Sequence, residues 1–138
     1  MSCFPLHLFK GINMKRTISE IIKEADALCP NKFDNKIKIA WLSRLDMIVT
    51  DEIIRKHENG RTFMFEGYNE TTSGEKELLI PEPYTDVYIH WLHSKMYLFE
   101  HDYERYNSAT SAFYASYQNY AAHYNRENKP VSPGIKMF

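Results

Sequence analysis

Tyrosine placement is the feature that most constrains this chain. Nine of its ten tyrosines lie between Tyr84 and Tyr124, and many of them are three or four residues apart. Side chains at this spacing share one face of an α-helix. Tyrosine joins a large apolar ring to one hydroxyl group, which suits surfaces that become buried on assembly. Burying every hydroxyl inside one small chain would require as many partners, at about 1–3 kcal/mol for each one left unpaired. The pattern therefore predicts helices, with part of the tyrosine series at an interface.

The N-terminal half predicts two helices. Thr17-Ile18-Ser19-Glu20 has the form of a capping box, and the helix it starts should end at Cys29, because the residue before a proline avoids the helical region. Asp34 or Asn35 should cap a longer helix, from about 35 to 57, which Asn59-Gly60 ends. Its apolar stripe is formed by Ile37, Ala40, Trp41, Leu45, Ile48, Val49 and Ile53.

The middle of the chain changes character. Two apolar runs, 62–65 and 77–80, flank a polar stretch at 69–74 that is rich in turn-forming residues. This arrangement predicts a β-hairpin or a pair of short strands. The same region is acidic, since the segment from Glu66 to Asp86 contains six acidic residues and one basic residue, Lys76.

The helical period returns at Tyr84. We expect a break at Asn107-Ser108, with Ser108 capping a last helix that runs to about Arg126. The predicted fold is mainly α: a four-helix subunit with a small β-hairpin between the second and third helices and an extended C-terminal arm. Residues 14–127 would form the helical domain and 128–138 the arm. Residues 1–13 are expected to be disordered or an upstream extension, because Met14 directly precedes a helix start.

Aromatic residues divide into two predicted groups. Trp41, Trp91, Phe99 and Phe113 are expected in the core, where rings at helical spacing usually lie. The candidate interface residues are Tyr103, Tyr106, Tyr114, Tyr117, Tyr120 and Tyr124.

Catalytic and metal chemistry find no support in the sequence. His90 and His93 are three residues apart, but no further ligands complete a zinc site, and no Glu-x-x-His pair indicates a di-iron site. No nucleophile elbow or phosphate-binding loop is present. We therefore predict a protein that is not an enzyme, without catalytic residues, cofactor or metal. Two cysteines are too few for a disulfide framework, and Cys29 should be a buried thiol.

Two interaction classes are also disfavoured. No apolar run approaches the roughly 18 residues that span a bilayer, so no membrane contact is expected. A formal net charge of −1 gives no general basic footprint for nucleic acid. The first two predicted helices could still form a helix-turn-helix, although the face that would read DNA is of mixed charge. That face holds Lys36, Lys38, Arg44, Asp46, Asp51 and Glu52.

Three segments resemble small head-to-tail connector (adaptor, head-completion) proteins of tailed bacteriophages and prophages. They are Leu78-Leu79-Ile80-Pro81-Glu82-Pro83-Tyr84-Thr85-Asp86-Val87-Tyr88, Tyr103-Glu104-Arg105-Tyr106-Asn107-Ser108 and Phe113-Tyr114-Ala115-Ser116-Tyr117. The resemblance covers about residues 15–126 and is strongest from 78 to 124.

The resemblance implies a structural virion protein, made in the bacterial host cytoplasm and placed at the head-tail junction. Its expected partners are copies of itself in a ring, the phage portal protein, and a downstream connector or tail protein. DNA would pass through the ring only as cargo. In such a ring, Glu66, Glu70, Glu75 and Glu77 are candidates for a channel-facing acidic loop, because like charge keeps DNA from adhering. The alternative function is a small helix-turn-helix DNA-binding phage regulator.

Overall fold

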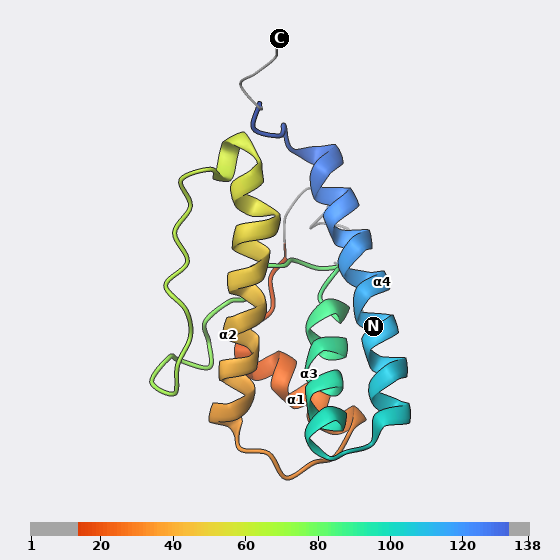
Figure 1. Cartoon of the computed structure of the whole chain (residues 1–138). Helices are drawn as coiled ribbons and strands as arrows, with labels where there is room; N and C mark the ends of the chain where they lie inside the picture. Colours follow the sequence, from red (N-terminus) through yellow and green to blue (C-terminus); the bar gives the residue numbers. More distant parts are fainter. Residues whose placement is uncertain (1–13, 133–138) are drawn as a thin grey trace, which may run out of the picture.

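The computed structural model describes residues 14–132, so the predictions for 1–13 and for the end of the arm, 133–138, lie outside the described residues. Within this part, four α-helices form a bundle, which confirms the mainly α fold. They are α1 (Ile18–Leu28), α2 (Asn35–Glu52), α3 (Asp86–Phe99) and α4 (Tyr103–Glu127). Figure 1 shows α3 between α2 and α4, with α1 crossing one end of the bundle.

Local sequence explains the boundaries of the first two helices. Both hydrogen bonds of the predicted capping box at Thr17 and Glu20 are present, and α1 ends at Leu28 before the buried Cys29, as predicted. The second helix begins at Asn35, but it ends at Glu52, earlier than the predicted residue 57. There the chain tightens into two 3₁₀ turns, η2 (Ile54–Lys56) and η3 (Glu58–Gly60).

The predicted β-hairpin is wrong. Residues 61–80, called the strap below, contain no strand. The first part runs along the side of α2 that faces away from α4, and the second part crosses α2 toward the core, where Leu78 and Ile80 are buried (Figure 1). The two apolar runs do not pair with each other. Leu78 N donates to Arg16 O at 2.9 Å and Ile18 N donates to Lys76 O at 2.9 Å, so the second run pairs with the chain that leads into α1. The first run is followed by Tyr68, whose N donates to Ser43 Oγ of α2 at 2.9 Å and whose ring packs against Phe65.

The predicted helix break at Asn107-Ser108 is also wrong. The chain reverses at His101, whose φ of 62° is in the left-handed region, and α4 starts at Tyr103. Asp102 is the N-cap, since its side chain accepts a hydrogen bond from Arg105 N at 3.3 Å. Asn107 and Ser108 are exposed inside α4, where polar side chains meet water and do not interrupt the helix.

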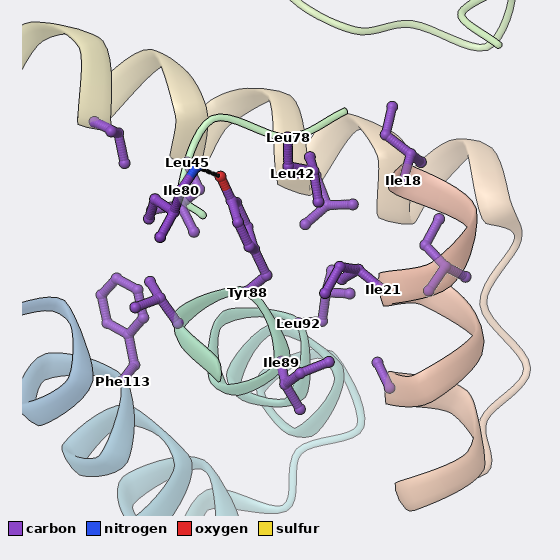
Figure 2. Packing of buried hydrophobic residues seen from close by; sticks show 14 of the residues in the cluster. Ile18, Ile21, Leu42, Leu45, Leu78, Ile80, Tyr88, Ile89, Leu92 and Phe113 are labelled. Atoms are coloured by element: carbon purple, nitrogen blue, oxygen red, sulfur yellow. Dashed lines mark hydrogen bonds between the residues drawn. The ribbon is translucent and has the colours of Figure 1, made fainter. Parts of the chain in front are cut away.

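A single apolar cluster joins α1, α2, α3 and the second half of the strap. Figure 2 shows Tyr88 of α3 reaching between Leu42 and Ile80, with Leu45 and Leu92 close by. These five side chains are all fully buried, and each contributes roughly 1.5–3 kcal/mol of hydrophobic stabilisation. The cluster fixes the relative positions of the first three helices.

The predicted aromatic core is partly confirmed. Phe113 is buried, and Trp41 and Trp91 are half-buried against the core. Phe99, in contrast, is 57% exposed and stacks on Trp41 at a centroid distance of 5.8 Å. It lies on the last turn of α3, where the bundle ends and no further element covers it in the part of the chain that the structure describes. Ile37 at the start of α2 is likewise exposed, so the apolar stripe of that helix is narrower than predicted.

The beginning of the C-terminal arm lies against the 3₁₀ turns. Val131 N donates to Lys56 O at 2.8 Å and Glu58 N donates to Lys129 O at 2.9 Å. His57, which is buried, adds a side-chain contact at 2.7 Å between its Nε2 and Asn125 Oδ1. These contacts fix where the arm leaves the bundle, beside the end of α2.

Candidate functional site: an aromatic groove between α2 and α4

A groove of about 350 Å³ lies between α2 and α4, with α3 as its floor. It forms because α3 packs mainly against α4 and holds it away from α2 (Figure 1). We call it the aromatic groove. Its main lining residues are Ile48, Glu52, Trp91, Lys95, Thr110 and Tyr114.

The candidate interface tyrosines fall into four environments. Tyr106, Tyr114 and Tyr117 line the aromatic groove, which brings together half of the predicted set. Tyr103 and Tyr114 are more than half exposed, at 56% and 57%. Tyr120 corrects the prediction, because it is only 2% exposed and belongs to the core.

Tyr124, the last of the set, is half-buried and packs edge to face on His57 with a centroid distance of 4.8 Å. It therefore helps to hold the C-terminal end of α4 to the 3₁₀ turns. The surface part of the tyrosine series is the N-terminal two-thirds of α4.

Charge in the aromatic groove comes from one base, Lys95, and one acid, Glu52. Lys95 Nζ lies 4.4 Å from the centroid of Trp91, a cation–π contact. Burial lowers the pKa of Lys95, and the nearby positive charge of Arg44 lowers it further. The acid, Glu52, accepts a hydrogen bond from Tyr117 at 2.8 Å. Burial and this bond to a carboxylate raise the pKa of Tyr117. Lys95 thus supplies a cation in the groove, with which a negatively charged group of a partner would pair.

One buried polar atom in the groove lacks a partner. Thr110 Oγ1 is the single buried side-chain nitrogen or oxygen without a hydrogen bond in the part of the chain that the structure describes. An unpaired buried hydroxyl costs about 1–3 kcal/mol. Thr110 lines the aromatic groove, but this oxygen is enclosed by neighbouring atoms and is not exposed to the groove.

A second polar cluster, centred on Asp46, was not anticipated from the sequence. Asp46 was expected on an exposed face of α2, yet it is fully buried. Its carboxylate accepts hydrogen bonds from Tyr68 Oη and Tyr88 Oη, both at 2.6 Å, and from Leu79 N at 3.1 Å. Tyr88 Oη in turn accepts a hydrogen bond from Ile80 N at 2.7 Å, the dashed line in Figure 2.

Electrostatics at Asp46 follow from this burial. Desolvation raises the pKa of Asp46 to about 6, although the hydrogen bonds from Tyr68 and Tyr88 and the charge of Lys15 oppose the shift. Burial also raises the pKa of both tyrosines, and the nearby carboxylate adds to the effect. Because Asp46 and Tyr88 are both 0% exposed, this cluster holds the strap to α2 and α3 and does not face a ligand. The sequence did contain a sign of this burial. Asp46 comes directly after the core residue Leu45 and three residues before Val49, so it lies beside the apolar face of the helix.

Like Asp46, Lys38 was expected on the exposed face that would read DNA, and it is also buried. It is 2% exposed, and its Nζ donates to Asp26 Oδ1 at 2.8 Å, which joins α1 to α2. With Lys38 and Asp46 both buried, the exposed face of α2 keeps few bases.

Histidines and acids do not combine into a metal site in the described residues, where no group of three potential ligands is found. His93 Nε2 instead contacts Ala25 O at 3.0 Å, and His101 Nδ1 contacts the hydroxyl of Tyr103 at 2.9 Å. None of the helices described in residues 14–132 is long and apolar enough to cross a membrane.

The acidic residues of the strap are all exposed. Glu66, Glu70, Glu75 and Glu77 point out from a segment that lies across α2 from α4. The candidate acidic loop and the aromatic groove therefore occupy different sides of the subunit.

Comparison with family models, with curated proteins and with solved structures finds no match for this chain.

Proposed function

We propose that this chain is a structural subunit of a tailed-phage virion. It would form a ring between the portal and the tail, extending the DNA channel during head completion. The observation that carries the proposal is the aromatic groove. A folded subunit with a satisfied core leaves aromatic side chains and Lys95 together in one open groove, and repeated contacts between subunits would cover them.

The strap supports the same proposal from the other side of the subunit. Its exposed acids, Glu66 to Glu77, would repel DNA if they faced the channel, so that the genome slides without adhering. The arm, which leaves beside the end of α2, would add contact to a neighbour or to the portal. No catalytic residue, cofactor or metal has a part in this function.

The test is assembly. The purified full chain is examined by size-exclusion chromatography with light scattering and by negative-stain electron microscopy, alone and with the portal protein of the same genome. Rings, or a complex with the portal, are the expected result. A chain that stays monomeric at every concentration and never binds the portal would refute the proposal.

The alternative function, a helix-turn-helix regulator, loses support because Lys38, one of the three bases on the face that would read DNA, is buried and paired with Asp26. The same preparations distinguish the two functions by salt. A DNA-binding regulator that contacts several phosphates loses affinity by orders of magnitude between about 50 and 200 mM salt. A connector should show no specific DNA binding at either salt concentration.

A further inference from the structure

The strap is held rigidly from within. Tyr68 at its centre is fixed to α2 by two hydrogen bonds, from its amide to Ser43 Oγ at 2.9 Å and from its hydroxyl to Asp46 at 2.6 Å. Phe65 packs edge to face on Tyr68 with a centroid distance of 5.0 Å. The outer side of this part of the strap is therefore presented in a fixed position, and little conformational entropy is lost when it binds.

The outer side carries an exposed methionine between half-buried phenylalanines. Phe63 and Phe65 face the molecule, whereas Met64 and Glu66 face solvent, in the alternation of an extended chain. Met64 is 75% exposed, the highest value among the large hydrophobic residues that the structure describes. A flexible thioether beside a carboxylate is thus available for a partner.

The aromatic groove offers the complementary chemistry. Sulfur makes favourable contacts with aromatic rings, and Trp91 and Tyr114 line the groove. Lys95 also lines the groove, with its Nζ 4.4 Å from the centroid of Trp91, and a carboxylate that enters beside this ring would pair with it.

We propose that Met64 and Glu66 of one copy dock into the aromatic groove of a second copy. The thioether contacts Trp91 and Tyr114, and the carboxylate pairs with Lys95. The two surfaces lie on different faces of α2, with Ser43 and Asp46 toward the strap and Ile48 and Glu52 toward the groove. The contact is therefore heterologous, and it repeats from copy to copy until a ring closes. This inference rests on the proposed ring and specifies its interface.

Disulfide trapping tests the contact directly. Met64→Cys and Tyr114→Cys are combined in one chain on a Cys3→Ser background, with the buried Cys29 left in place. Under mild oxidation, alone at high concentration and with portal protein, a ladder of dimers, trimers and higher species should appear on non-reducing gels. The matched control joins Tyr114→Cys to Met47→Cys, because Met47 is also exposed, at 50%, but lies on α2.

Mixing the two single-cysteine chains sharpens the result. A heterologous contact predicts dimers only, because each chain then carries one half of the contact. A ladder from the Met47 pair as strong as that from the Met64 pair would overturn the inference.

Charge exchange gives a second measurement that does not depend on cysteine. Glu66→Lys and Lys95→Glu should each weaken assembly roughly three- to tenfold, and the double variant should recover most of the loss. Glu70→Lys, which changes an exposed acid of the same strap, is the control and should have little effect. Circular dichroism verifies that each variant is folded.

The outcomes separate the inference from the proposed function. Suppose that rings or portal complexes form, but the chain with Met64→Cys and Tyr114→Cys gives no ladder and the charge exchange gives no recovery. That result overturns the inference and leaves the connector function standing. Loss of both assembly and portal binding in the unmodified chain refutes the two together.

Discussion

Tyr88 of the Asp46 cluster and Tyr114 of the aromatic groove lie on neighbouring helices in opposite circumstances. Tyr88 is fully buried, and its hydroxyl both donates to Asp46 and accepts from Ile80 N. Tyr114 is 57% exposed and lines a groove that also holds the unpartnered Thr110. The first environment pairs its polar groups within the subunit, while the second leaves a tyrosine side chain open to solvent. The difference shows that some tyrosines of one sequence can stabilise the folded core while others remain exposed on the surface and available for contact.

The largest effect should come from removing the acceptor at the centre of the buried cluster. Asp46→Ala leaves the hydroxyls of Tyr68 and Tyr88 and the amide of Leu79 without their carboxylate. We expect a loss of about 3 kcal/mol in the free energy of unfolding, measured by urea denaturation. The control is Glu52→Ala on the same helix, whose exposed carboxylate accepts from Tyr117 and should contribute less than about 1 kcal/mol. Equal losses in the two variants would abolish the distinction between the regions.

The next effect is a dependence of stability on pH. Asp46 has its pKa raised by burial to about 6 in the folded state, so folding favours the protonated acid. Its stabilising contribution is complete below about pH 4 and is lost as the pH rises through 6, by about 3 kcal/mol in total. Urea denaturation between about pH 4 and pH 8 should show this fall as a difference from Asp46→Asn, which cannot ionise. A difference that rises with pH would contradict the assignment.

A smaller effect tests single hydroxyl groups. Tyr88→Phe removes the oxygen that joins Ile80 N to Asp46, and we expect a loss of about 2 kcal/mol. Tyr117→Phe removes a half-exposed hydroxyl from the aromatic groove and should cost less than about 1 kcal/mol. Chemical denaturation measures both. A loss in Tyr117→Phe as large as that in Tyr88→Phe would place the groove in the stability core.

The smallest effect concerns the turn that joins the helices of the two regions. His101 has a φ of 62°, which a side chain disfavours and glycine accepts freely. His101→Gly should therefore raise the melting temperature, through a gain of up to about 1 kcal/mol, and leave assembly unchanged. A lower melting temperature would show that the contact of His101 with Tyr103 stabilises the fold by more than the positive φ of His101 destabilises it.

Local signals in the sequence predicted the elements better than their limits. The capping box at Thr17 and the stop at Cys29 were correct, because both depend on residues within one helical turn. The α3–α4 boundary was missed because a histidine, where glycine is usual, takes the left-handed position and Asp102 caps the next helix. The β-hairpin failed for a different reason. Its two runs have strand character, but α2 and the chain before α1 compete for them.

The candidate site was only half predictable. Spacing alone placed Tyr106, Tyr114 and Tyr117 on one helix, and the structure brings them to one groove. Spacing did not show that Tyr120 enters the core, since that depends on the packing of Tyr84, 5.6 Å away between ring centroids, against α4. Lys95 and Thr110 were missed because a side chain becomes part of a groove only when the neighbouring helix is placed.

The separation of Asp46 from its partners along the chain sets an order for folding. Tyr68, Leu79 and Tyr88 lie 22, 33 and 42 residues away from it. Contacts between residues this far apart form only after the intervening chain has closed into loops, which costs conformational entropy. The hydrogen bonds within a helix join residues four apart and do not require such closure. We expect the strap to dock last and to open first. Amide exchange at Leu79 and Ile80 should then report opening of the strap, while the amides of α2 and α3 exchange only through global unfolding.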